Sequence, residues 1–106
     1  MSLDDRKNAF ENKYKHDEEL KFKVDARLAK LFGLWIAEQL GLGEEQAAAY
    51  GKQMVMTQMD NPGNDDIIDK GFSDLKAAGK DFARHTLETQ IGHLEAKAKE
   101  QIMTES

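Results

Sequence analysis

The fold of this chain is decided by residues 20–41, LKFKVDARLAKLFGLWIAEQLG. Apolar residues recur in this stretch at steps of three and four, which is the spacing of one face of an α-helix. Gly41 stands at its end, where glycine readily takes the left-handed conformation that closes many helices. The pattern predicts an amphipathic helix with a buried stripe, formed by Leu20, Val24, Leu28, Leu31 and Trp35 with Leu34 and Leu40 beside it.

Three further helices are indicated between the glycines and the single proline that interrupt the rest of the chain. Helical apolar spacing fills the intervals at about 44–59, 65–78 and 82–102. Their expected inner faces are Ala47, Tyr50, Met54 and Val55, then Ile67, Ile68, Phe72 and Leu75, then Leu87, Ile91, Leu94, Ala98 and Ile102. Because short connections favour antiparallel neighbours, we expect an all-α fold in which residues 20–106 form a compact four-helix bundle.

Signals at the helix ends support these boundaries. Asn64 and Asp81 are expected N-caps, and Gly79 is expected just past the end of the third helix. Gly51, inside the second helix, costs about 1 kcal/mol relative to alanine, so this helix should depend on tertiary packing. The largest core or near-core groups are expected to be Trp35, Phe72 and Phe82.

Residues 1–19 do not fit this core. Ten of the nineteen are Asp, Glu, Lys or Arg, and such a polar segment does not bury enough apolar surface to offset its ordering entropy. The segment also lacks proline and glycine, and Phe10 and Tyr14 lie four residues apart, so it could instead continue the first helix outward. A frayed, mobile terminus and a segment that becomes helical on a partner are both compatible with the sequence.

Composition narrows the class of protein. The 106 residues suffice for one domain, and the absence of cysteine excludes disulfides and thiolate chemistry. A net charge of −5 argues against general nucleic-acid binding, which depends on cationic side chains. No apolar run is long enough for membrane insertion, and the N-terminus lacks a signal-peptide core, so we expect a cytoplasmic protein.

No catalytic or metal-binding constellation stands out. Neighbouring residues of a helix point in different directions, so residues 16–19, His-Asp-Glu-Glu, do not converge on one ion. His85 and His93 are two turns apart and are expected at the surface, and Asp65-Asp66 is typical of a helix start. We therefore expect no metal, no cofactor and no enzymatic activity, since no acid, base or nucleophile is paired with a partner.

The order of motifs between Asp4 and Gly41, DDRKNAFENKYKHDEELKFKVDARLAKLFGLWIAEQLG, closely resembles the zeta-subunit family, the ATPase inhibitors of alphaproteobacterial F-type ATP synthases. LKAAG at 75–79 and AKAKEQI at 96–102 look like later parts of the same family. Gly71 and Gly92, which fall inside expected helices, and the loosely similar residues 53–69 are departures that affect the packing of the bundle more than the first segment.

The resemblance implies a helical protein whose mobile N-terminal segment, residues 1–19, inserts at a catalytic α/β interface of the synthase head, near the central rotor γ. Insertion there would block rotation in the hydrolytic direction, while the bundle, residues 20–106, docks outside the cytoplasmic head of the membrane-bound synthase. The inhibitory stretch of the family maps onto Asp4, Asp5, Arg6, Lys7, Ala9, Phe10, Glu11, Lys13, Tyr14, His16 and Asp17.

A second hypothesis is a small helical regulatory module that responds to nucleotide or metal, although no phosphate-binding motif supports it. Met54, Met56 and Met59 could also mark an adaptable binding surface, although methionine at helical spacing more often fills a core. The sequence thus favours an inhibitor of ATP hydrolysis that works by binding.

Overall fold

The computed structural model describes residues 3–105, and the side chains of residues 18–105. Four helices account for most of the chain: α1 (Leu3–Leu40), α2 (Glu44–Asp60), α3 (Asp65–Ala77) and α4 (Arg84–Glu105). No strand occurs within the described range, and the expected all-α, four-helix fold is confirmed. Residues 1–19 are the segment that we expect to be mobile, and the side chains of residues 1–17 lie outside the described ones.

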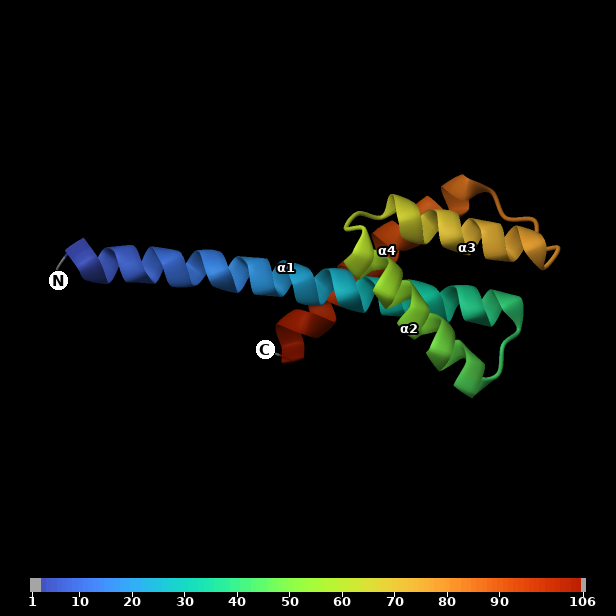
Figure 1. Cartoon of the computed structure of the whole chain (residues 1–106), viewed down its shortest axis with the longest axis horizontal. Helices are drawn as coiled ribbons and strands as arrows, with labels where there is room; N and C mark the ends of the chain where they lie inside the picture. Colours follow the sequence, from blue (N-terminus) through green and yellow to red (C-terminus); the bar gives the residue numbers. More distant parts are fainter. Residues whose placement is uncertain (1–2, 106) are drawn as a thin grey trace.

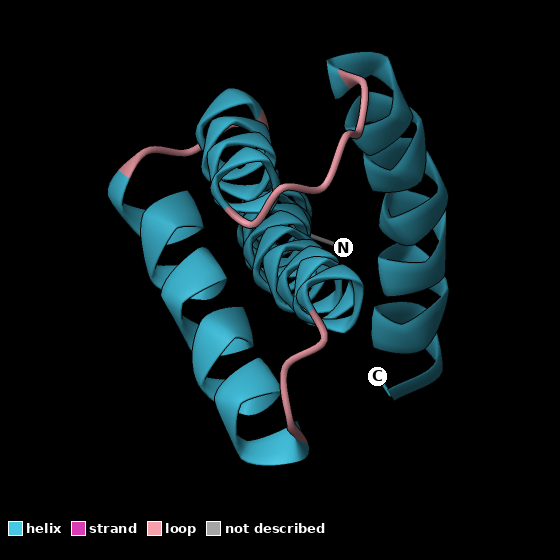
Figure 2. Ribbon diagram, turned by 90° about the vertical axis from the view of Figure 1, so that its right-hand side faces the viewer, coloured by secondary structure: helices cyan, strands magenta, loops and turns pink. Residues whose placement is uncertain are grey.

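The bundle is organised around α1. Figure 2, which views α1 and α3 nearly end-on, shows α2 and α4 on opposite sides of them. Helix α1 packs most extensively against α2 and next against α4. Its N-terminal half extends well beyond the other three helices (Figure 1), which gives the molecule its 63 × 25 × 22 Å dimensions. The backbone of residues 3–19 is helical in continuity with the rest of α1.

The inner face of α1 is centred on a different row of side chains from the one expected. Leu28, Phe32 and Ile36 are fully buried, whereas Leu31 and Trp35 are only partly buried at the flank of the core. Because α1 packs between α2 and α4, its buried face is wider than one stripe and also takes in Ala29 and Ala37.

The expected large aromatic groups lie beside the core rather than at its centre. Trp35, Phe72 and Phe82 are partly buried and pack against it, and Phe32 is the largest side chain that is fully buried. The Trp35 ring stacks on Phe32 at 6.2 Å between centroids and meets Phe82 edge-on at 5.9 Å. Trp35 thus joins the core to the loop before α4.

Two glycines bring α1 and α2 into close contact. A Cβ atom on Gly33 would lie 2.8 Å from the Gly51 Cα and 3.1 Å from the Met54 Cβ. This approach leaves no room for a side chain at position 33, whereas a Cβ on Gly51 would make only ordinary contacts, the nearest at 3.6 Å.

Glycine caps form as expected, and one of the two expected N-caps is wrong. Gly41 (φ +74°) and Gly79 (φ +77°) are both left-handed, and the next N–H reaches back to the carbonyl of Ala37 or Leu75 respectively. Asn64 occupies the N-cap position of α3 but its side chain makes no capping hydrogen bond.

Helix α4 begins at Arg84, so Asp81 does not cap it. The contact of Phe82 with Trp35 accounts for this difference, because residues 80–83 form an irregular connection that carries the Phe82 ring onto α1. The expected inner face of α4, by contrast, is buried at all five positions. The third helix also buries Ile67, Ile68 and Leu75 as expected, with Phe72 partly buried.

Candidate functional site

The eleven expected site residues all lie on the outer part of α1, between Asp4 and Asp17. Their backbone is helical, and their side chains lie outside the described ones. The structure therefore places them together on one projecting helix and leaves their individual roles as predictions. What it does describe in atomic detail is the region where this helix leaves the bundle.

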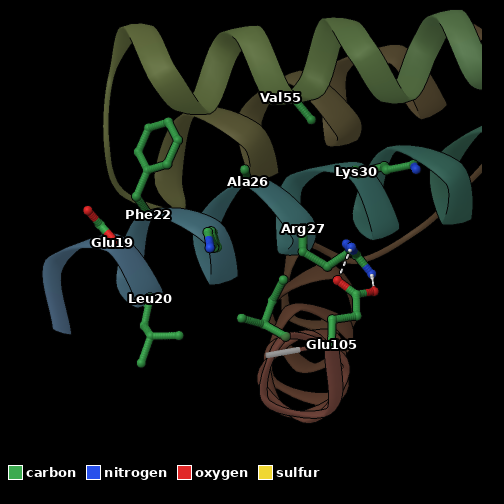
Figure 3. A pocket seen from close by; sticks show the side chains of 10 residues that line it. Glu19, Leu20, Phe22, Ala26, Arg27, Lys30, Val55 and Glu105 are labelled. Carbon is green, nitrogen blue, oxygen red and sulfur yellow. Dashed lines mark hydrogen bonds and ion pairs between the residues drawn. The ribbon is translucent and has the colours of Figure 1, made fainter. Parts of the chain in front are cut away.

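A groove of about 740 Å³ lies at the base of the projecting part of α1 (Figure 3). This base groove runs between α1, the middle of α2 and the end of α4. It is lined by Glu19, Leu20, Phe22, Lys23, Ala26, Arg27, Lys30, Val55, Ile102 and Glu105. The sequence analysis missed it, because the residues that meet there are separated by up to 86 positions (105 minus 19).

Arg27 joins α1 to the C-terminal end of α4 inside this groove. Its two terminal nitrogens donate to the two Glu105 oxygens, both at 2.9 Å (Figure 3). Its Nη1 also donates to Gln101 Oε1 at 2.8 Å. Such a paired contact fixes geometry well, although an exposed ion pair of this kind adds only about 0–1 kcal/mol of stability. Arg27 therefore sets the position of α4 relative to the base of the projecting helix.

Exposed apolar side chains surround the same region. Phe22 is 56% exposed and Met59 is 50% exposed, and both line a small cavity between α1 and the end of α2. The exposed Met103 lines another depression of about 400 Å³, together with Leu20 and Val24 of α1. Large apolar groups on a surface often mark a protein interface when they gather in one place.

The methionines of α2 divide between the two roles considered for them. Met54 is fully buried in the core, whereas Met56 and Met59 are exposed. The first is core filling, and the other two are available to a partner, for which the flexible thioether side chain is well suited.

Other polar contacts hold the helices together. Tyr50 donates a hydrogen bond to Asp74 Oδ2 at 2.6 Å, and the Lys70 ammonium lies 5.2 Å from the Tyr50 ring centroid and pairs with the same carboxylate. Burial raises the pKa of Tyr50 far above its usual value, and the bond to Asp74 raises it further, so the phenol stays protonated. Arg84 pairs with Asp69 and so links α3 to α4.

Among the described residues, no group of three or more His, Asp or Glu side chains is placed to hold a metal ion. His85 and His93 are both exposed, as expected. Across residues 3–105, none of the helices combines the length and the apolar character needed to cross a membrane.

A helix that projects from a small bundle, with a groove and exposed apolar groups at its base, is the architecture of a helical binding protein. The chain belongs to the ATPase inhibitor subunit zeta family, whose model matches residues 1–101. This match confirms the resemblance noted in the sequence, and it identifies the chain as a regulatory inhibitor subunit rather than an enzyme.

A solved structure, described as a solution NMR structure, shares this fold. It is 33% identical to the chain and superimposes with a TM-score of 0.71, and the match covers 82% of this chain and 99% of the other. No curated protein sequence gives a significant match.

Proposed function

We propose that this chain inhibits ATP hydrolysis by inserting residues 1–19 at a catalytic α/β interface of the F-type ATP synthase head, close to the rotor subunit γ. Membership of the inhibitor family supports inhibition of the synthase in general. The observation that carries the insertion mechanism is the course of α1, a single helix of 38 residues of which only the second half is enclosed by the bundle (Figure 1).

The dimensions of the two parts suit different tasks. A helix is about 10–12 Å in diameter with its side chains, and residues 3–19 span about 25 Å along its axis at about 1.5 Å per residue. The whole molecule is more than 20 Å wide in both short directions. A cleft that admits the single helix would stop the bundle, so residues 20–106 would set how deep the segment enters.

Positions 10 and 14 are one turn apart on this helical backbone, so Phe10 and Tyr14 are the proposed apolar anchors of the inserted segment. The charged positions around them would make polar contacts with the α, β and γ subunits. An inserted rod would obstruct the movements that accompany hydrolysis without any chemistry of its own. The site of action would be the cytoplasmic head of the membrane-bound synthase.

The decisive experiment is ATP hydrolysis by the purified cognate head, titrated with three proteins. These are the full chain, residues 20–106 alone, and a full-length control in which the order of residues 1–19 is scrambled. The scrambled control keeps the length, composition and charge of the segment.

We expect inhibition by the full chain only. Equal inhibition by residues 20–106 would show that the bundle is the active part, and equal inhibition by the scrambled chain would show that charge alone acts. Circular dichroism of all three checks that the bundle folds, because the buried core begins at Leu28, well inside the retained part.

A further inference from the structure

The exposed apolar side chains of this protein gather around the point where α1 leaves the bundle. Four large apolar groups are exposed among residues 18–105, namely Phe22, Met56, Met59 and Met103. Three of them, Phe22 of α1, Met59 of α2 and Met103 of α4, line hollows in this region. Single apolar groups on a surface need no explanation, whereas a group of them from three helices indicates an interaction site.

Phe22 stands in the middle of this region. Its ring is 56% exposed and stands off α1 toward α2 (Figure 3). It borders the base groove, the small cavity that it shares with Met59, and a third hollow of about 370 Å³ whose other lining residues are Glu18, Glu19 and Lys23. A partner could therefore enclose the ring on several sides, and enclosed aromatic groups dominate the affinity of many protein interfaces.

The base groove beside Phe22 has apolar walls on two sides. Val55 of α2 and Leu20 of α1 are both partly exposed there (Figure 3). Three cations and two carboxylates also line the groove, but Arg27 and Glu105 are paired with each other. The charge that a partner meets in the groove is therefore decided by the remaining three groups.

These three groups are Lys23, Lys30 and Glu19. The two lysines lie seven residues apart, which is about two helical turns, so they stand on the same side of α1. Neither lysine forms an ion pair with a described side chain. The lining thus carries a net positive charge, although the whole chain carries a net charge of −5.

Phe22, Met59 and the lining of the base groove together form what we call the base surface. We propose that the base surface docks an amphipathic, acidic segment of the synthase head at the rim of the opening that α1 enters. Apolar side chains of that segment would pack on Phe22 and Met59, and its carboxylates would face the two unpaired lysines. The methionine side chain adapts easily to the shape of such a partner.

This inference rests on the proposed function, because the location of the partner follows from insertion. Phe22 lies only three residues beyond the segment 1–19, on the same unbroken helix. A helix that enters a cleft to this depth brings the groups around its base against the rim of the cleft. The base surface is therefore the part of the bundle that continues the interface of the inserted segment.

A second copy of this chain fits the base surface less well than the head does. In a symmetric dimer the same patch of both copies meets, so two positively charged groove linings would face each other. Of the four exposed large apolar groups, only Met56 lines none of the hollows around the base, which leaves no comparable apolar patch for an asymmetric contact. Self-association is still an outcome that the test distinguishes.

The first test identifies the partner by cross-linking. The chain contains no cysteine, so a single introduced cysteine can carry a photo-crosslinker at one chosen place. Met59→Cys puts the label on the base surface, and Lys80→Cys is the matched control, exposed in the loop after α3 at the end of the molecule away from the projecting segment (Figure 1). Labelled full-length chains are bound to the purified cognate head, and the linked peptides are identified by mass spectrometry.

We expect Met59→Cys to link to a head peptide that contains both apolar and acidic residues, and Lys80→Cys to give little product. Equal products from the two positions would overturn the proposal. Links only between two copies of a dimeric chain would assign the base surface to self-association and would overturn it as well.

The second test measures the dissociation constant of full-length variants on the same head, together with inhibition at saturation and thermal unfolding. Phe22→Ala should weaken binding at least tenfold, as the loss of a central aromatic anchor does. Its Tm should change little, because more than half of the ring is already exposed. Met56→Ala is the matched control, since Met56 is 63% exposed and lies outside the base surface, and it should bind like the parent.

The double variant Lys23→Gln/Lys30→Gln should weaken binding about two- to fivefold at low salt, whereas Lys80→Gln should not. Higher salt should reduce the effect of the double variant and leave that of Phe22→Ala unchanged. Inhibition at saturation should remain complete in every variant, because residues 1–19 are intact.

Unchanged affinity in Phe22→Ala would overturn the proposal. An unchanged affinity of the double lysine variant, with a linked peptide that lacks acidic residues, would overturn the chemistry assigned to the partner. If the parent binds the head without inhibiting it, the insertion mechanism fails, and the affinity of Phe22→Ala still decides whether the base surface docks.

Discussion

The close crossing of α1 and α2 makes a sharp prediction about Gly33. In Gly33→Ala the new Cβ would lie 2.8 Å from the Gly51 Cα, and carbon atoms normally approach to about 3.5–4.0 Å. A backbone atom cannot rotate away, so α2 must move outward by about 1 Å. Overpacking of this kind costs about 1–3 kcal/mol, and the move would also loosen Met54, whose Cβ is 3.1 Å from the same point.

Alanine is also a better helix former than glycine by about 1 kcal/mol, which opposes this loss. Because the clash is with backbone, we expect the overpacking to dominate and Gly33→Ala to lose about 1–2 kcal/mol. Gly92→Ala is the matched control, since nothing lies within 4 Å of its added Cβ, and it should gain about 0.5–1 kcal/mol. Gly51→Ala would meet Leu34 at an ordinary 3.6 Å, so it should be neutral or slightly stabilising.

Thermal unfolding followed by circular dichroism separates these cases. A difference of about 2 kcal/mol between Gly33→Ala and Gly92→Ala corresponds to roughly 10 °C in Tm for a domain of this size. Urea titration gives the free energies directly. If Gly33→Ala proved as stable as Gly92→Ala, the close approach of the two backbones would be refuted.

The remaining predictions concern the inserted segment, the aromatic flank and the buried tyrosine. The double variant Phe10→Ala/Tyr14→Ala should weaken inhibition of the cognate head with no change in Tm, and undiminished inhibition would remove their anchor role. Trp35→Ala should cost about 2–3 kcal/mol in urea unfolding and Phe32→Ala about 3–5 kcal/mol, because only Phe32 is fully buried; the reverse order would contradict the observed orientation of α1. Burial and the Asp74 bond raise the pKa of Tyr50 in the folded chain, so this group contributes stability that is present below the unfolded pKa of about 10 and declines as pH rises above it. Tyr50→Phe should flatten that alkaline decline, and an unchanged pH profile would show that Tyr50 does not cause it.

The ease of prediction differed among the helices for physical reasons. Helix α4 packs through a single narrow face, and periodicity identified every buried position from Leu87 to Ile102. Helix α1 lies between two neighbours, so its buried face is broad. The centre of this face is at Phe32 and Ile36, whereas the sequence predicted it at Leu31 and Trp35. Spacing alone does not reveal how many partners a helix has.

Side-chain caps were harder to predict than glycine caps. A left-handed residue at Gly41 or Gly79 follows from the backbone itself, whereas a side-chain cap competes with other partners. Asn64 accepts a hydrogen bond from Gln58, and the course of the chain near Asp81 is set by the packing of Phe82. The local signal thus placed the start of α3 correctly at Asn64, whereas tertiary packing overrode it at Asp81.

The base groove and the small cavity beside it could not be predicted from the sequence, because their linings come from different helices. Nothing in the sequence indicates that Asp25 and Gln58 line one cavity or that Arg27 meets Glu105. The projecting segment, by contrast, was recognisable from its charge and its lack of an apolar face. Its family match was likewise carried by short motifs in order along one helix.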